Sequence, residues 1–181
     1  MRIIDNFLPA PEWYWRTCLN RQFQDIDGFR GISIVSGQNF ARTLLDDLIF
    51  TPATSPAFVR SSFLRRSPAD QIEPNDIHSD AGMGDWTGIL YLTPEPPPSD
   101  GTVFWAHKET ASTTGPDDIW QADGHDRAKW QEVARVEAKF NRLLLFPANR
   151  FHSRAIVENY GEGDEARLGQ VMFGKGDIQW Q

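Results

Sequence analysis

The spacing of apolar positions changes along the chain near residue 57. Residues 2–8 form a short apolar run that predicts a first strand, and residues 10–23 read as a helix with Pro11 in its first turn. Residues 39–50 carry apolar side chains at helical spacing, which predicts a second helix. The stretch 25–37 between the two predicted helices has the composition of a loop.

From about residue 58, short apolar runs separated by turn residues replace the helical spacing. The strand candidates are residues 57–67, 76–80, 87–93, 101–107, 134–140, 141–147, 151–157 and 166–174. Residues 108–131 form a long polar segment, which we expect to be a mobile loop at the mouth of an active site. Two helices followed by about eight strands predict a mainly β fold of the α+β class, a jelly roll buttressed by N-terminal helices. We expect one domain over residues 1–181, with helical support over 1–57 and the β core over 58–175.

Charge and cysteine content narrow the functional classes. The formal net charge of −7 makes a nucleic-acid partner unlikely, because phosphate neutralisation by basic residues supplies most of such affinity. The single cysteine, Cys18, has no partner for an internal disulfide, which favours a reducing compartment. No run has the length of a signal peptide core or of a membrane-spanning segment. We therefore expect a soluble cytoplasmic protein without a membrane partner.

Two histidine-acid pairs are candidates for metal chemistry. His78 and Asp80 are two residues apart, so in a strand both side chains would project from the same face and offer two ligands to a divalent ion. A second histidine from another strand would complete a set of two histidines and one carboxylate, which leaves open positions on iron. His107 and Glu109 form a competing pair. Either pair taken alone is more often a surface feature, so the surrounding elements must decide.

The order of elements around His78 resembles the Fe(II)/2-oxoglutarate-dependent oxygenase superfamily, in particular its compact prolyl-hydroxylase-like branch. "HSD" is followed by "YLT", by "DGTVFW" and by "LLLFPANRFH", and the chain opens on "IIDNFLP". Thr93 stands where the branch commonly has asparagine, and Asp100 replaces a glycine. The resemblance spans about residues 1–175. Within the superfamily, the chain is similar to an uncharacterised bacterial subfamily. The resemblance implies a double-stranded β-helix, Fe(II), 2-oxoglutarate as cosubstrate and O₂.

The resemblance also implies roles for individual residues. His78, Asp80 and His152 match the metal ligands, which are the catalytic centre of such enzymes. Without the resemblance, His152 would read as a histidine that caps a strand or packs under a loop.

The resemblance places a basic residue on the last strand, where Arg167 is the first choice to bind the far carboxylate of 2-oxoglutarate. Arg154 is the alternative, since it would share a strand face with His152. Tyr91 and Thr102 match cosubstrate contacts loosely, and either also reads as an ordinary residue of a β core.

The function predicted on this basis is hydroxylation of an unidentified small-molecule or peptide substrate. Two alternatives stay open. One is a non-catalytic jelly-roll binding module, in which the spacing of His78 and Asp80 is a coincidence. The other is a cupin-like metalloprotein that does not use 2-oxoglutarate. His107 and His125 could contact substrate, but lone histidines in loops mostly face solvent. The sequence does not predict an oligomeric state.

Overall fold

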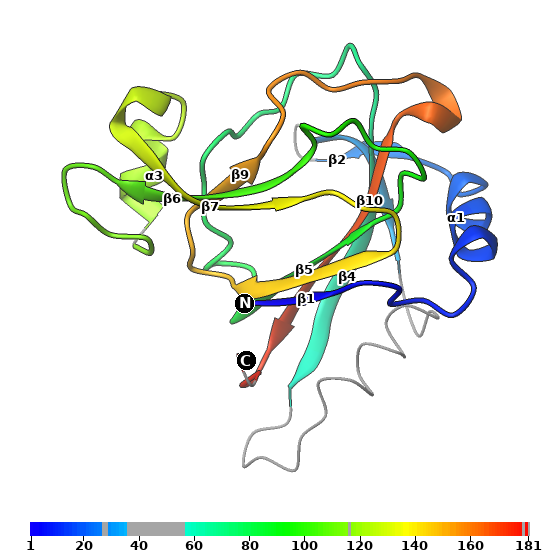
Figure 1. The fold of residues 1–181 in the computed structure, drawn as a ribbon, viewed down its shortest axis with the longest axis horizontal. Coiled ribbons are helices and arrows are strands. Elements are labelled where there is room, and N and C mark those ends of the chain that lie inside the picture. Colours follow the sequence, from blue (N-terminus) through cyan, green and yellow to red (C-terminus); the bar gives the residue numbers. More distant parts are fainter. Residues whose placement is uncertain (27–28, 36–56, 116, 179, 181) are drawn as a thin grey trace.

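The computed structural model describes residues 1–26, 29–35, 57–115, 117–178 and 180, and these are mostly strands (Figure 1). The strands are β1 (Arg2–Ile4), β2 (Gln24–Ile26), β3 (Phe29–Ile34), β4 (Phe58–Ser67), β5 (Trp86–Tyr91), β6 (Gly101–His107), β7 (Trp130–Glu137), β8 (Arg142–Pro147), β9 (His152–Arg154) and β10 (Arg167–Lys175). The helices are α1 (Pro11–Leu19), α3 (Asp117–Asp123) and two 3₁₀ turns, η1 (Arg127–Lys129) and η2 (Gly163–Glu165).

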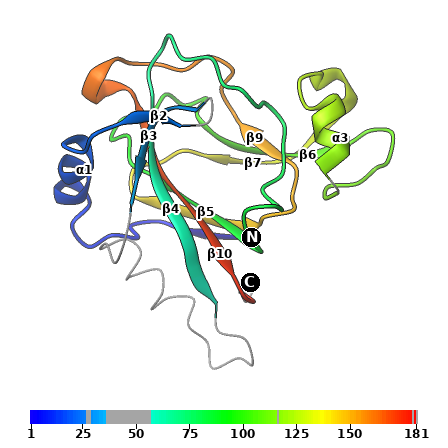
Figure 2. The same cartoon turned by 180° about the vertical axis from the view of Figure 1, so that it is seen from behind.

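The strands form two sheets. The larger sheet has the order β1-β8-β5-β10-β4-β3-β2 and the smaller has the order β7-β6-β9, with antiparallel pairing throughout. Helices α1 and α3 lie at opposite ends of the molecule in both views (Figures 1 and 2). The predicted mainly β architecture is therefore confirmed for the described residues.

Strand β8 shows how the larger sheet separates two interiors. Leu143 and Leu145 join the apolar cluster that includes Tyr14 and Cys18 of α1. Leu144 and Phe146 alternate with them and pack against Phe104 and Val136 of the smaller sheet. Successive side chains of a strand point to opposite faces, so a strand buried on both faces needs an uninterrupted apolar run such as "LLLF". The space between the two sheets is the interior that holds the candidate site.

Three expectations about local structure were wrong. The described part of residues 25–37 is not a loop, because β2 and β3 pair at the edge of the larger sheet. Residues 76–80 are not a strand, since His78 makes only an isolated bridge to His152. The segment 108–131 is not a plain loop either, because it contains α3 and η1. Its mobility stays a prediction.

Two further expectations concern the second helix and membrane-spanning segments. The helix expected over residues 39–50 lies outside the described residues. Within them, no helix is both long and apolar enough to cross a membrane.

Candidate metal centre

Backbone hydrogen bonds, rather than a shared strand, bring His78 and Asp80 to His152. The amide of each histidine donates to the carbonyl of the other at 2.9 Å, and the amide of Asp80 donates to the carbonyl of Ala148 at 2.8 Å. The segment between β4 and β5 is thereby joined to the turn between β8 and β9. That turn follows the apolar run of β8 and returns the chain into the interior.

The three side chains converge on one point. The Nε2 atom of His78 lies 3.7 Å from Oδ1 of Asp80, and Nε2 of His152 lies 3.3 Å from Oδ2. One donor atom from each residue falls within 4.8 Å of the others, and the imidazole centroids are 4.4 Å apart. In the described part of the chain, no other set of three or more histidine, cysteine or acidic residues brings its ligand atoms this close together. Two imidazoles and one carboxylate make a donor set that suits Fe(II).

Both imidazoles are held through their other nitrogen. Nδ1 of His78 lies 2.9 Å from the carbonyl oxygen of Asp76, and Nδ1 of His152 lies 2.9 Å from that of Arg150. A carbonyl oxygen only accepts, so Nδ1 carries the proton and Nε2 keeps the lone pair that a metal requires. Each acceptor is two residues before its histidine, and the two ligands are therefore oriented by the same local device.

The charge balance of the group favours an ionised carboxylate. Burial opposes ionisation of Asp80, but the neighbouring His152 outweighs it and lowers the pKa of Asp80 to about 2. Burial also opposes a charge on His152, yet Asp80 raises the pKa of this imidazole above its usual value. Burial and the nearby His152 lower the pKa of His78. Thr87 on β5 donates to Oδ2 of Asp80 at 2.9 Å and fixes the carboxylate.

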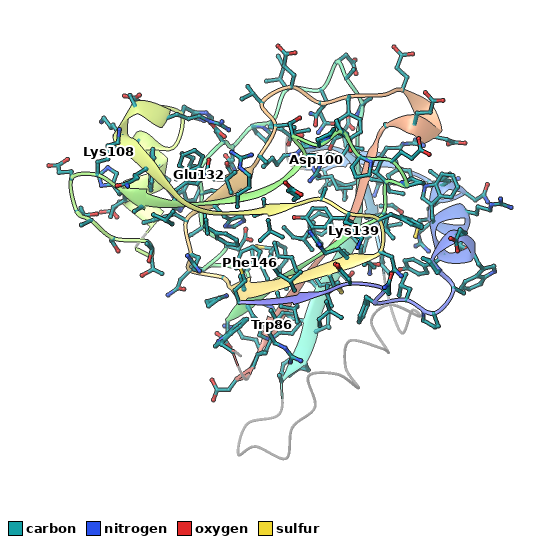
Figure 3. The ribbon with its side chains drawn as sticks, in the orientation of Figure 1. Trp86, Asp100, Lys108, Glu132, Lys139 and Phe146 are labelled. Atoms are coloured by element: carbon teal, nitrogen blue, oxygen red, sulfur yellow. The ribbon has the colours of Figure 1, made fainter. Side chains whose placement is uncertain are left out.

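A group of charged residues lies further along the same interior. We call His78, Asp80 and His152 the metal group. Strands β6 and β9 pair Phe104 with His152 and Thr102 with Arg154, so this second region begins about two residues from the metal group. Figure 3 shows Asp100 just before the start of β6 and Lys108 just after its end, beside α3. We call the set of Arg65, Glu73, Asp100, Arg154 and Arg167 the arginine end of the interior.

Arg167 is held by Asp100 through one side of its guanidinium. Nε of Arg167 donates to both carboxylate oxygens of Asp100, at 2.9 and 3.0 Å, and the hydroxyl of Tyr160 donates to the same carboxylate at 2.8 Å. Neither Nη atom of Arg167 makes a hydrogen bond to the described residues, and neither is among the fully buried atoms that lack a partner. Burial works against the charge of Arg167, but Asp100 raises its pKa. The end of this guanidinium therefore has no hydrogen-bond partner among the described residues.

The guanidinium of Arg154 is paired differently from that of Arg167. Its Nη1 pairs with Glu73, which also pairs with Arg65, while its Nε and Nη2 are fully buried without a partner. Burial and the charge of Arg167 lower the pKa of Arg154 to about 9. Arg154 does share the face of His152, as predicted, but Glu73 takes one of its donors.

Tyr91 and Thr102 meet at the arginine end. Their hydroxyl groups lie 2.7 Å apart, and burial raises the pKa of Tyr91 to about 12. Tyr91 is paired across the sheet with Gly169, two residues from Arg167. The structure therefore brings all four predicted cosubstrate residues into one region.

The competing histidine pair has a different environment. Nε2 of His107 lies 3.0 Å from Oδ2 of Asp123, and Nδ1 lies 3.3 Å from the hydroxyl of Thr110. His107 is thus committed to linking β6 to α3. His125 lines a cavity of about 230 Å³ between the His78 segment and α3, together with Asn75, Asp76 and Trp120.

The sequence reasoning missed the residues that support the site. Thr87 was visible as a polar residue in an apolar strand. Asp100 was noticed only as a replacement for glycine, and Glu73 gave no signal because one of its two arginine partners, Arg154, is 81 positions away.

Comparisons with solved structures show the fold. SnoK, a non-heme alpha ketoglutarate dependent carbocyclase from nogalamycin biosynthesis, matches with a TM-score of 0.58 and 16% identity over 94% of this chain and 77% of SnoK. HygX from Streptomyces hygroscopicus, with nickel, 2-oxoglutarate and hygromycin B bound, matches with a TM-score of 0.61 and 13% identity over 95% of this chain and 80% of HygX. SnoN, an epimerase solved with Fe3+, alpha ketoglutarate and nogalamycin RO, gives 0.57 and 14% over 95% and 77%. No protein-family model matches the chain, and no curated protein matches it.

Proposed function

We propose that this chain is an Fe(II)- and 2-oxoglutarate-dependent dioxygenase of the prolyl-hydroxylase-like branch. Its β core over residues 58–175 would be the double-stranded β-helix, or jelly roll, of that superfamily. The observation that carries the proposal is the convergence of His78, Asp80 and His152, with both Nε2 atoms directed at one carboxylate. The likeness in fold to structures that hold iron or nickel with 2-oxoglutarate supports it.

His78, Asp80 and His152 would hold Fe(II). Iron in such a site, supplied with 2-oxoglutarate and O₂, provides oxidation of a substrate C–H bond coupled to release of succinate and CO₂. The chain contributes the fixed tautomers of both imidazoles and an ionised Asp80 that Thr87 keeps in place. Hydroxylation is the reaction that we assign.

Arg167 would anchor the far carboxylate of 2-oxoglutarate, with Tyr91 and Thr102 beside it. Its two open Nη atoms offer the planar fork that binds a carboxylate with two hydrogen bonds, while Asp100 fixes the other side of the guanidinium. Arg154 is less suited because its Nη1 is already paired with Glu73.

The charge count at the arginine end also suits a monoanionic group. Three guanidinium groups (Arg65, Arg154, Arg167) against two carboxylates (Glu73, Asp100) leave 3 − 2 = 1 positive charge. One ligand carboxylate would neutralise this charge, which is the condition for burying an ion at low free-energy cost.

We propose a small organic molecule as the substrate rather than a peptide. HygX and SnoN are solved with hygromycin B and nogalamycin RO, which supports this class without naming the compound. A cytoplasmic location and a single domain over residues 1–181 complete the proposal.

The test is an anaerobic titration of Fe(II) and 2-oxoglutarate into the purified protein. A weak visible charge-transfer band, together with calorimetric binding of 2-oxoglutarate that requires Mn(II), is the expected result. Metal binding without 2-oxoglutarate binding would favour the cupin-like alternative. Binding of neither would leave the jelly-roll binding module.

A further inference from the structure

The segment that carries His78 is held against the α3 and η1 insertion at three places. The amide of Ile77 donates to the carbonyl of Gly124 at 3.1 Å. The rings of Trp120 and His78 meet edge to face, with centroids 6.3 Å apart. Arg127 binds Asp76 with two hydrogen bonds, from Nε at 2.6 Å and from Nη2 at 2.7 Å. We call this last contact, between Arg127 and Asp76, the Asp76 clamp.

The Asp76 clamp reaches the metal group through one residue. The carboxylate of Asp76 is held by Arg127, and the backbone carbonyl of the same residue is the acceptor for Nδ1 of His78 at 2.9 Å. Arg127 is itself backed by Trp105, with its guanidinium carbon 5.6 Å from the ring centroid. The indole nitrogen of Trp105 in turn donates to Ser153, next to His152. Arg127 is therefore braced against both segments that supply histidines.

The two histidines differ in how their carbonyl acceptors are fixed. Arg150, the acceptor for His152, lies in a turn closed by its own amide and the carbonyl of Pro147 at 3.1 Å, and it bridges to Thr114. Asp76, the acceptor for His78, lies between β4 and β5, where the chain forms no helix or strand. Local backbone structure fixes one acceptor, whereas the other is held to the segment between β6 and β7 by the Ile77 amide and by the guanidinium of Arg127.

We propose that Arg127 is a positioning residue that sets the orientation and tautomer of His78 through Asp76. The inference rests on the proposed function only in requiring that His78, Asp80 and His152 bind a divalent ion. A bidentate guanidinium holds the Asp76 side chain against the segment between β6 and β7, to which the Ile77 amide is also bonded through Gly124. That amide and the Asp76 carbonyl share one peptide plane, so the two contacts together keep the carbonyl directed at His78. Loss of such an outer partner typically lowers metal affinity 10- to 100-fold. Because Arg127 belongs to the insertion between β6 and β7, the insertion also acts on the metal group.

The experiment is a Co(II) titration of the full chain, followed by calorimetry and by the visible d–d absorption of the ion. For Arg127→Gln we expect about tenfold weaker Co(II) binding, an altered d–d band and faster hydrogen exchange at the Ile77 amide. Arg127→Lys keeps the charge but loses the fork, so it should restore part of the affinity. Arg135→Gln is the matched control, because Arg135 binds Glu132 with the same two-bond geometry, at 3.0 and 2.7 Å, away from the metal group. It should leave Co(II) binding unchanged.

The outcomes separate this inference from the proposed function. A wild type that binds no divalent ion overturns both. Wild-type affinity in folded Arg127→Gln overturns the positioning role alone, and so does a lower melting temperature without a change in Co(II) affinity. If Arg127→Gln does not fold, Asp76→Asn takes its place, since it keeps the backbone carbonyl and weakens only the clamp. An unchanged affinity in that variant likewise overturns the inference.

Discussion

The two regions of the sheet interior are organised in opposite ways. At the metal group, the ligands are fixed by backbone carbonyls and amides, and a single carboxylate carries the charge. At the arginine end, five charged side chains hold one another, and most of their partners are distant in sequence. A metal site needs donors at fixed positions, which backbone contacts supply. A site for an anion needs balanced charge, which side chains supply. Substitutions should therefore separate the two regions.

The largest effect is expected at the metal group. His152→Ala or Asp80→Ala should abolish saturable Co(II) binding, because either change removes one of the three donor residues. The loss of Co(II) affinity should therefore be larger than the loss caused by removing a residue that only orients a ligand. Calorimetry of the protein with Co(II) measures this. His107→Ala is the control, since His107 is a buried histidine that contacts Asp123 instead of the metal group. Equal loss in that variant would contradict the assignment.

Arg167→Ala should weaken 2-oxoglutarate binding to the Mn(II)-loaded protein by about 30-fold to several thousandfold. The reason is that truncating one partner of a buried charge pair costs about 2–5 kcal/mol. Mn(II) affinity itself should change little, because Arg167 contacts none of the three ligands. Calorimetric titration of 2-oxoglutarate gives the value.

Arg154→Ala provides the comparison within the arginine end. It should reduce 2-oxoglutarate affinity less than Arg167→Ala but lower the free energy of unfolding by up to about 3 kcal/mol, because Glu73 loses one of its two guanidinium partners. Urea denaturation measures the stability. A larger loss of 2-oxoglutarate affinity than in Arg167→Ala would move the anchor to Arg154.

Metal affinity should fall on acidification. His152 has a raised pKa and must release its proton to bind a metal, so protons compete with the ion below that pKa. Co(II) affinity should decrease by about tenfold per pH unit there and level off above it, for one displaced proton. Titrations in buffers of different ionisation enthalpy would count the released protons. Affinity independent of pH between 5 and 8 would contradict the prediction.

The smallest expected effect is at Asp100. Asp100→Asn keeps an oxygen that accepts from Nε of Arg167 but removes the negative charge, so the region gains one net positive charge. We expect 2-oxoglutarate to bind about fivefold more tightly, from the stronger attraction to Arg167. The same titration decides the sign. Weaker binding would show that the charge of Asp100 is needed to hold the guanidinium in place.

The sequence alone determined the strand content and the residue types of the site. Short apolar runs separated by turn residues predict strands, because a strand buries a few consecutive side chains and then ends at a turn. Residues 141–147 were predicted as a strand from their apolar run, and the structure shows that both faces of β8 are covered. The grouping of His78, Asp80 and His152 was what the resemblance to a known superfamily implied, and the structure brings the three together.

Only the tertiary structure decided how these residues are held and which partner each arginine has. His78 and Asp80 do not meet on a strand face. They are placed by hydrogen bonds to a turn some 70 residues later, and periodicity does not record such contacts. The Asp76 clamp and the pairing of Arg167 with Asp100 join residues 51 and 67 positions apart. Side-chain pairing at that separation depends on how the sheets pack, which is why the different partners of Arg167 and Arg154 could not be predicted from the sequence.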